Sequence, residues 1–532
     1  MLRLQKKPKP LVILILDGWG VAQDSTGNAI TRADLVNFNE LWYSYPHAAL
    51  SSAGQSVGLP EGQVGNSEVG HMNLGAGRIV FQDLLRINMS IADGTFFENA
   101  AFKAVVEHAK KYGSKIHLMG LVGLGSVHSE SEHLYALLSF IAKQDIAQSR
   151  VKLHLFTDGR DSPPTSARFY LNEIKSKLAA LGVGQIASIC GRYFAMDRDN
   201  RWDRTEKAYK AICGQGENTQ KDPIEAVEKS YSEGKTDEFI EPAIIVDESG
   251  VPVGPVSEND AIIFLNYRPD RTRQLSKAFV LEDLTELKSA SDEKITTFQR
   301  GKKIGNLFFV SMTRYEKNLP VNKIAYEPEE VEMPISRVFS DLGAKQLHIA
   351  ETEKYAHVTY FFNGGKEQPF PKEERILIDS PKVASYDLKP EMSTPQVAQT
   401  LISKISSDAY DFIVCNFANA DMVAHTGNLD ATIKAVQIID KYLGEITKVV
   451  FAKGGGLVVT SDHGNAEEMI NLRTGEIDTE HNINPSPCIF VFEQLRGQHC
   501  LFPQGLLADL APTILSLLQI PKPQQMTGRS LL

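Results

Sequence analysis

The residue whose surroundings best suit covalent chemistry is Ser67, which lies between Gly65 and Gly70 in a segment with little apolar bulk. A serine hydroxyl is a poor nucleophile at neutral pH unless a neighbouring base or a metal ion lowers its pKa. The segment is not a Gly-x-Ser-x-Gly elbow, because Asn66 and Glu68 flank Ser67 and the second glycine comes too late. Taken alone, it suits a turn or a helix start better than an active site. Ser67 becomes a candidate nucleophile only through partners elsewhere in the chain.

Carboxylate and imidazole side chains far from Ser67 in the sequence have the types and spacings of metal ligands. Asp421 and His425 are four residues apart, which places both on one face of a helix. Oxygen and imidazole ligands without sulfur suit manganese, magnesium or zinc, and the residues alone do not choose among them. The candidates are Asp17, Asp421, His425, Asp462, His463 and His481. Together with Ser67 they predict a serine activated by metal ions.

Four times in the middle of the chain, arginine lies at or soon after the end of a predicted strand. Guanidinium groups offer planar, paired donors that match phosphate and carboxylate, so converging arginines describe a site for a small polyanion. The alternative is surface ion pairing with the neighbouring aspartates. The arginines are Arg160, Arg192, Arg198, Arg268 and Arg271. Their repetition at strand ends favours the anion site.

Apolar segments alternate with helical periodicity along the chain, which predicts an α/β fold. Residues 11–16 are apolar throughout, as in a parallel strand buried on both faces, and Asp17 follows at the carboxyl end, where open α/β sheets bind ligands. The other strands expected are 115–121, 151–156, 186–190, 262–265, 307–310, 412–416 and 457–460, and the helices include 101–111 and 166–180. A glycine-rich run at 120–125 lacks the order of a dinucleotide loop, which argues against nicotinamide binding.

The 532 residues are too many for one ordinary core, so the length predicts two domains and leaves three open. A formal net charge of −10 argues against general binding to nucleic acid or anionic membranes. The basic residues 1–10 lead into a short apolar run that Asp17 interrupts, so we expect a buried strand there and not a signal peptide. No run is long enough to span a bilayer, and we expect a cytoplasmic protein.

Several motifs together resemble those of the cofactor-independent phosphoglycerate mutases, a two-domain branch of the alkaline phosphatase superfamily. The motifs are residues 14–20 (LILDGWG), 65–71 (GNSEVGH), 158–161 (DGRD), 198–202 (RDNRW), 266–271 (NYRPDR), 351–359 (ETEKYAHVT) and 461–465 (SDHGN). The match continues to residues 526–531 (MTGRSL) near the end of the chain.

This resemblance implies two α/β domains, each a mostly parallel sheet flanked by helices. Residues 1–81 and 312–532 would form a discontinuous, phosphatase-like domain that binds metal, and residues 82–311 an inserted, transferase-like domain that binds substrate. Gly75-Ala76-Gly77 and Ser311-Met312-Thr313 are the expected hinges.

The resemblance also implies roles for individual residues. One metal ion would bind to Asp421, His425 and His481, and a second to Asp17, Ser67, Asp462 and His463, with Mn²⁺ expected at both. The residues implied to bind substrate are His128, Arg160, Asp161, Arg192, Arg198, Arg268, Arg271 and Lys354.

The implied activity is the interconversion of 3-phosphoglycerate and 2-phosphoglycerate, in glycolysis and gluconeogenesis, through a phosphoserine at Ser67 and without added bisphosphoglycerate. Lys354 would neutralise charge on the phosphoryl oxygens, and Asp161 would act as acid and base for the glycerate hydroxyls. Domain closure would exclude water. The expected partner is this small substrate alone, with no nucleic acid and no membrane, and the expected state is a monomer.

Two segments depart from the family pattern. Where the family reads SDGGVHSH, residues 123–130 read GLGSVHSE, which keeps His128 but loses an aspartate and replaces the second histidine by Glu130. Residues 281–306 look longer and more polar than the family pattern, and the polar residues 282–303 within them predict a surface insertion with a solvated face. Two other functions stay open. One is a phosphomonoesterase or another phosphomutase on the same fold, and the other is a non-catalytic metal-binding descendant, although neither Ser67 nor any ligand is lost.

Overall fold

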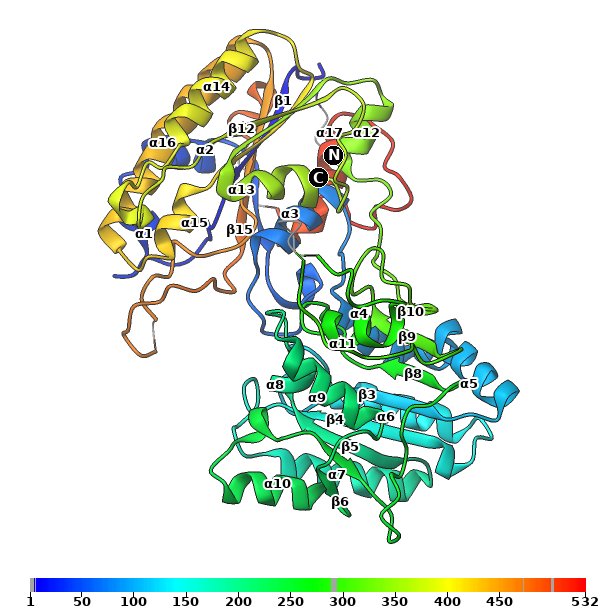
Figure 1. Ribbon diagram of the computed structural model, residues 1–532. Coiled ribbons are helices and arrows are strands. Elements are labelled where there is room, and N and C mark those ends of the chain that lie inside the picture. The colour runs from blue at the N-terminus through cyan, green and yellow to red at the C-terminus, as the bar shows by residue number, and fades with distance from the viewer. Residues whose placement is uncertain (1–3, 5, 289–293, 472, 499–501) are drawn as a thin grey trace. The chain divides into compact units, whose positions relative to one another are not determined.

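The computed structural model describes residues 1–532 apart from 1–3, 5, 289–293, 472 and 499–501. The chain divides into two compact units: unit 1 is formed by residues 1–82 and 329–532, and unit 2 by residues 83–328. Each unit contains its own eight-stranded sheet flanked by helices (Figure 1). The fold is therefore α/β, as predicted. Among the described residues, no helix has both the length and the apolar character that crossing a bilayer requires.

The sheet of unit 1 is mostly parallel, and only β15 runs antiparallel to its neighbours among the described pairs. Across the sheet the strands are β12 (Glu373–Ile378), β11 (Gln346–Glu351), β13 (Phe412–Phe417), β1 (Leu11–Leu16), β14 (Gly456–Thr460), β15 (Ser486–Val491), β2 (His47–Ser51) and β16 (Gly505–Leu506). β1 thus lies between β13 and β14, both parallel to it.

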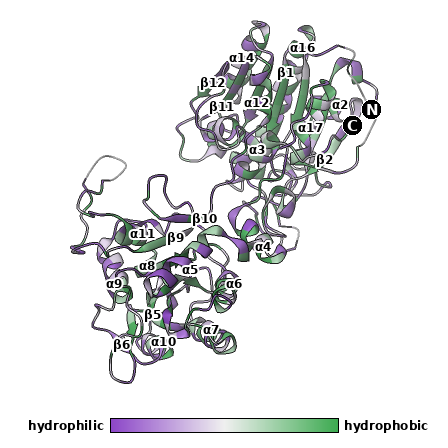
Figure 2. Ribbon diagram, turned by 90° about the vertical axis from the view of Figure 1, so that its right-hand side faces the viewer, coloured by the Kyte–Doolittle hydropathy of each residue, from purple (hydrophilic) through white to green (hydrophobic). Residues whose placement is uncertain are grey.

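Strand β1 is buried on both faces, which explains its uninterrupted apolar sequence, green in Figure 2. Val12, Leu14 and Leu16 pack into a core on one face, while the alternate residues of β1 pack into a second core on the other face. The first core is covered by α1 (Ala29–Arg32), α2 (Val36–Ser44), α14 (Thr394–Ser406) and α16 (Leu429–Ala452), and the second by α3 (Ser67–Ala76), α12 (Ile335–Asp341) and α17 (Leu510–Leu517).

The sheet of unit 2 is also mostly parallel, with one described antiparallel pair among its main strands, β5 with β7. Its strands in order are β10 (Lys323–Tyr326), β9 (Phe308–Thr313), β8 (Ala261–Phe264), β3 (Ile116–Val122), β4 (Val151–Thr157), β5 (Gln185–Gly191), β7 (Ala243–Ile245) and β6 (Thr219–Gln220). One core includes residues of α4 (Asp83–Asp93), α5 (Ala100–Tyr112), α6 (Ser131–Ala142), α7 (Ala167–Leu181) and α10 (Pro223–Ser232), and the other those of α8 (Arg192–Ala195), α9 (Trp202–Ile212) and α11 (Arg273–Val280).

The first boundary between the units lies one residue from the predicted one, but the second lies 17 residues later than predicted. The sequence predicts a return to the first domain at residue 312, but β9 and β10 extend the sheet of unit 2, so the return comes after residue 328. The expected hinge at 311–313 lies inside β9, and Gly75 and Ala76 form the last turn of α3. The pairing of β9 with β8 and of β10 with β9 keeps residues 308–326 in the sheet of unit 2.

The predicted surface insertion at residues 282–303 includes residues 289–293, which lie outside the described residues. Its described parts are mostly exposed or partly exposed, but two apolar side chains are buried. Leu284 and Phe298 are buried in the core that α9 and α11 cover. The guanidinium group of Arg300 donates to the carbonyl oxygens of Ala278 and Glu282, at 2.7 and 2.8 Å. Apolar side chains spaced between polar ones therefore anchor this segment.

Candidate metal and active site

The candidate ligands of unit 1 come from the carboxyl ends of adjacent parallel strands. Asp17 directly follows β1, and Asp462 and His463 follow β14. Asp421 lies in the short helix α15 (Asn419–Ala424), which follows β13. Because the ends of parallel neighbours meet at one edge of a sheet, side chains far apart in the sequence are brought together there.

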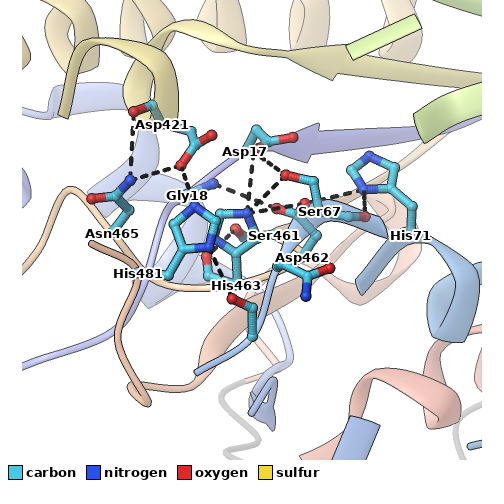
Figure 3. A network of polar contacts seen from close by, with 12 residues as sticks. Asp17, Gly18, Ser67, His71, Asp421, Ser461, Asp462, His463, Asn465 and His481 are labelled. Atoms are coloured by element: carbon cyan, nitrogen blue, oxygen red, sulfur yellow. Dashed lines mark hydrogen bonds and ion pairs between the residues drawn. The ribbon is translucent and has the colours of Figure 1, made fainter. Parts of the chain in front are cut away.

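Ser67 is the first residue of helix α3, which Asn66 caps through its side chain. The residue is buried, with an exposed fraction of 6%. Ser67 Oγ lies 2.9 Å from His463 Nε2 and 3.3 Å from Asp17 Oδ1 (Figure 3). It also lies 2.7 Å from Lys354 Nζ. The predicted nucleophile is thus surrounded by predicted ligands.

The close approach of α3 to the loop after β14 depends on Gly70. A Cβ atom at Gly70 would lie 2.5 Å from the carbonyl oxygen of Asp462 and 2.7 Å from its Cβ atom. Only glycine fits this contact, which holds Ser67 beside the strand ends.

Asp421, His425 and His481 form one group, called site A, whose ligand atoms lie within 4.8 Å of one another. His481 Nε2 is 3.0 Å from His425 Nε2 and 3.2 Å from Asp421 Oδ1. The Nδ1 atoms of His425 and His481 face the carbonyl oxygens of Thr479 and Gly65, at 2.7 and 2.9 Å, and so carry the protons. The two Nε2 lone pairs therefore converge on one position beside a carboxylate, and Asp421 raises the pKa of His425. This position favours a cation.

Asp17, Ser67, Asp462 and His463 form a second group, called site B. His463 Nε2 is 3.5 Å from both Asp17 Oδ1 and Asp462 Oδ2. Burial and the charge of Asp462 raise the pKa of Asp17 to about 7, and burial lowers the pKa of His463 to about 4, so this imidazole is neutral. Crowded carboxylate oxygens beside a neutral imidazole nitrogen are a donor set that fits a divalent metal ion.

Two further residues, His71 and Asn416, complete site B and were not singled out from the sequence. His71 Nδ1 lies 2.9 Å from the carbonyl oxygen of Ser67 and 3.0 Å from Asp462 Oδ2. Asn416 Nδ2 donates to Asp17 Oδ2 at 2.7 Å and lies 3.0 Å from His71 Nε2. The sequence could have indicated His71, because it lies one helical turn after Ser67. Nothing in the sequence indicated Asn416 beyond its position in an expected strand.

Lys354 connects the two sites. It lies in α13 (Thr352–Ala356), directly after β11, and is buried. Its ammonium group donates to Asp17 Oδ1 at 2.6 Å, to Asp421 Oδ2 at 2.7 Å and to Ser67 Oγ. Burial disfavours this charge, but Asp17 and Asp421 outweigh it and raise the pKa of Lys354. A permanent positive charge is therefore held against the serine hydroxyl.

The predicted arginines of unit 2 combine ion pairing with an excess of positive charge. Arg192 is buried and bonds through Nη1 to Asp158 and Asp161, at 2.6 and 2.5 Å. Arg198 and Arg268 share the carboxylate of Asp270, at 2.8 and 3.1 Å. Burial, followed by repulsion from neighbouring arginines, lowers the pKa of Arg271; these neighbours are Arg198, Arg192 and Arg160. The guanidinium groups converge, and those of Arg160, Arg198 and Arg268 remain about half exposed.

His128 lies between the two carboxylates of this arginine cluster. Its Nε2 atom is 3.9 Å from Asp161 Oδ2, and its Nδ1 atom is 3.6 Å from Asp270 Oδ1. Burial, followed by the charge of Arg192, lowers the pKa of His128 to about 4. The ring is therefore neutral at pH 7.

The altered loop at residues 123–130 is held by Ser162. Ser162 Oγ accepts hydrogen bonds from the backbone N–H groups of Leu124 and Gly125, at 2.9 and 3.0 Å, and donates to Asp158 Oδ2 at 2.8 Å. Glu130 accepts from Asn88 Nδ2 at 2.9 Å. The loop that carries His128 is thus tied to the 158–162 segment despite its altered sequence.

Comparison with known proteins gives matches over nearly the whole chain. Residues 87–317 match the family model described as BPG-independent PGAM N-terminus (iPGM_N). The chain is 49% identical over 538 residues to the 2,3-bisphosphoglycerate-independent phosphoglycerate mutase of Chloroflexus aggregans, covering 99% of each chain. It is 48% identical over 533 residues to that of Thermomicrobium roseum, covering 99% of this chain and 98% of the relative.

A solved structure agrees with this. The phosphoglycerate mutase of Leishmania mexicana at low cobalt concentration matches with a TM-score of 0.60 and 27% identity, over 99% of this chain and 98% of that chain. The fold and these relatives define an enzyme of the isomerase class. The chain belongs to the 2,3-bisphosphoglycerate-independent phosphoglycerate mutases.

Proposed function

We propose that the enzyme interconverts 3-phosphoglycerate and 2-phosphoglycerate through a phosphoserine at Ser67. The observation that carries this proposal is the position of Ser67 Oγ, within hydrogen-bonding distance of both His463 Nε2 and Lys354 Nζ. The relatives that cover the whole chain bear the name of this activity. A buried hydroxyl placed beside a fixed positive charge suits attack on a phosphate ester.

Site A would hold one divalent ion through Asp421, His425 and His481, and site B a second through Asp17, Ser67, Asp462 and His463. Mn²⁺ is our choice, because the family resemblance implies it and because carboxylate oxygens, imidazole nitrogens and a hydroxyl are compatible with it. Bound ions would supply the acidity of the serine hydroxyl and positive charge near the phosphoryl oxygens.

The reaction proceeds in two half-reactions. Ser67 Oγ loses its proton and bonds to phosphorus, the ester bond to glycerate breaks, and the released glycerate oxygen takes up a proton. The other glycerate hydroxyl then loses its proton and attacks phosphorus, and Ser67 regains its own. Lys354 donates to Ser67 Oγ and stabilises the charge that gathers on the transferred group.

The arginine cluster would bind the carboxylate and phosphate of the substrate, because its guanidinium groups exceed the carboxylates they pair with. The residues concerned are Arg160, Arg192, Arg198, Arg268 and Arg271, with His128 as a neutral hydrogen-bonding partner. Asp161 would relay protons between the glycerate hydroxyls. Arg192 holds the pKa of Asp161 below its ordinary value although burial opposes this, so Asp161 begins as the base.

The wider setting follows from this activity. The reaction belongs to glycolysis and gluconeogenesis, so we place the enzyme in the cytoplasm, acting as a monomer on a small phosphoglycerate.

The test is trapping of the phosphoenzyme. Purified protein is given Mn²⁺ and ³²P-labelled 3-phosphoglycerate without bisphosphoglycerate, and acid-quenched samples are mapped by peptide. We expect 2-phosphoglycerate and label on the peptide that contains Ser67. Ser67→Ala should show neither, while Ser340→Ala, at another buried serine of unit 1, should show both. Full mutase activity in Ser67→Ala would overturn the proposal.

The same experiment separates the mutase from a phosphomonoesterase. Both would form a phosphoserine, but a hydrolase would release inorganic phosphate in proportion to the 3-phosphoglycerate consumed. We expect 2-phosphoglycerate to account for nearly all of the substrate consumed on approach to equilibrium.

A further inference from the structure

Glu467 is a fully buried carboxylate in unit 1 that touches neither Ser67 nor a candidate metal ligand in the described hydrogen bonds. Its Oε2 atom accepts from the backbone N–H groups of Gly20 at 2.8 Å and Asn465 at 3.0 Å. Its Oε1 atom accepts from Asn484 Nδ2 at 3.1 Å. One side chain thus joins three loops that are distant in the sequence.

Each of these loops carries a candidate metal ligand close to the residue that Glu467 contacts. Gly20 comes three residues after Asp17, and Asn465 comes two residues after His463. Asn484 comes three residues after His481. The contacts of Glu467 therefore reach the loops of site B and of site A.

Asn465 extends this connection to site A by a second route. Its backbone N–H donates to Glu467, while its side-chain Nδ2 donates to Asp421 Oδ1 at 2.7 Å. Displacement of Asn465 would change the orientation of the Asp421 carboxylate.

Two glycines pack closely against the carboxylate of Glu467. A Cβ atom at Gly20 would lie 2.2 Å from Glu467 Cδ, and one at Gly464 would lie 2.4 Å from Glu467 Oε1. The loops also bond to one another, since Gly18 O accepts from Ala466 N and Gly464 O from Asn482 N. Glu467 fills the gap between the loops with little room for another arrangement.

We propose that Glu467 is a positioning residue that sets the geometry of both metal sites by holding the loops of Asp17, His463 and His481 together. This inference rests on the metal sites of the proposed function. Charge-assisted hydrogen bonds to a buried carboxylate are strong and directional, so they fix backbone that carries ligands. Loss of such outer contacts typically lowers metal affinity by about 10–100-fold.

Glu467→Gln is the sharpest variant, because the amide fits the same space but cannot satisfy all three donors. With its oxygen toward Gly20 and Asn465, its NH₂ group faces Asn484 Nδ2. That NH₂ group of Asn484 is also held by Glu468 Oε2, at 2.9 Å, so it cannot turn away freely. In the opposite orientation, the amide NH₂ faces the two backbone N–H groups.

The experiment measures Mn²⁺ affinity by the electron paramagnetic resonance signal of free Mn²⁺, with unfolding midpoints recorded in chelator. We expect Glu467→Gln to weaken Mn²⁺ binding by about tenfold and Glu467→Ala by about 100-fold. Glu468→Gln is the matched control, because this neighbouring carboxylate contacts Asn484 but not the other two loops in the described hydrogen bonds, and its affinity should stay that of the wild type.

Unchanged Mn²⁺ affinity in folded Glu467→Gln would overturn the inference, even with a lower unfolding midpoint, because that result describes a purely structural residue. If Glu467→Ala does not fold, Glu467→Gln decides alone. Wild-type protein that binds no Mn²⁺ would instead remove the proposed metal sites and this inference with them, so the two failures are distinguishable.

Discussion

The ammonium group of Lys354 lies between Asp17 of site B and Asp421 of site A, and it forms an ion pair with each carboxylate. A bound metal ion would compete with this ammonium group for the same carboxylates. Lys354→Met keeps the length of the side chain and removes the charge. We expect kcat to fall by roughly 10³-fold, because a positive charge aimed at the transferred group is lost. Mn²⁺ affinity should not fall, since Asp17 and Asp421 lose a competing positive charge.

Steady-state kinetics and Mn²⁺ titration of Lys354→Met check both outcomes. Lys372→Met, at an exposed lysine that bonds to a backbone carbonyl in the same unit, is the control and should match the wild type. A Lys354→Met protein that keeps its kcat would contradict the assigned role.

His133 of unit 2 gives stability a pH dependence. Its Nε2 atom lies 2.7 Å from Asn88 Oδ1, and burial lowers its pKa to about 3. Its ordinary pKa is near 6.5, so below that pH the unfolded chain binds a proton that the folded chain does not. The contribution of His133 to the free energy of unfolding is therefore present above pH 6.5 and is lost as the pH falls toward 3.

We expect His133→Gln to reduce the loss of stability between pH 7 and pH 5, by at most about 1.4 kcal/mol per pH unit. Urea unfolding at pH 7, 6 and 5 measures this. Equal pH slopes in the wild type and the variant would show that His133 does not titrate differently in the folded state.

Some residues of the candidate site could be predicted from the sequence, and others could not. Asp17 and the Asp462-His463 pair were predictable, because each follows an apolar strand and its chemistry is visible locally. His71, Asn416 and Glu467 were not, because each acts through contacts with loops hundreds of residues away or across a helix turn. A polar residue reveals such a role only when the fold places its partners.

At the scale of elements, helix α3 is positioned by contact rather than by its own sequence. Gly70→Ala would push α3 away from the loop of Asp462, because no space exists for the added methyl group. A displacement of about 1 Å at the reacting group can lower the rate by about 10²-fold. We expect a loss of that size in kcat, measured beside Gly216→Ala, whose added Cβ meets Ile244 no closer than 3.4 Å.

A Gly70→Ala enzyme with wild-type kcat would mean that Ser67 does not need this contact.

The elements themselves were largely predictable: β1, β4 and β14 lie within one residue of their expected bounds, because buried parallel strands are apolar throughout. The end of unit 2 was not predictable from the sequence. Strand β10 joins the sheet by backbone hydrogen bonds to β9, and its short sequence of mixed polar and apolar residues does not indicate this pairing.

At the scale of the whole molecule, the two units should respond differently to removal of metal. The candidate ligands belong to unit 1, and the tryptophans divide between the units: Trp19 and Trp42 in unit 1, Trp202 in unit 2. Trp202→Phe leaves fluorescence from unit 1 alone, and Trp19→Phe with Trp42→Phe leaves that of unit 2.

We expect chelator to lower the unfolding midpoint of the unit 1 signal by roughly 5 °C or more and Mn²⁺ to restore it, because bound ions stabilise only the folded ligands. The midpoint of the unit 2 signal should stay within about 1 °C. Equal shifts of both signals would contradict the assignment of the ligands to one unit.

Strand β1 of unit 1 pairs with two strands that the ribosome synthesises about 400 residues later. Leu11 of β1 aligns with Phe412 of β13 and Gly456 of β14. At about 5–20 residues per second, a ribosome needs roughly 20–80 s to reach those partners. During that time unit 2 can complete its sheet. The six consecutive apolar residues of β1 have no partner strand on either edge until β13 and β14 are made. Nascent chains of this enzyme should therefore depend on a chaperone that shields the first strand until translation is nearly finished.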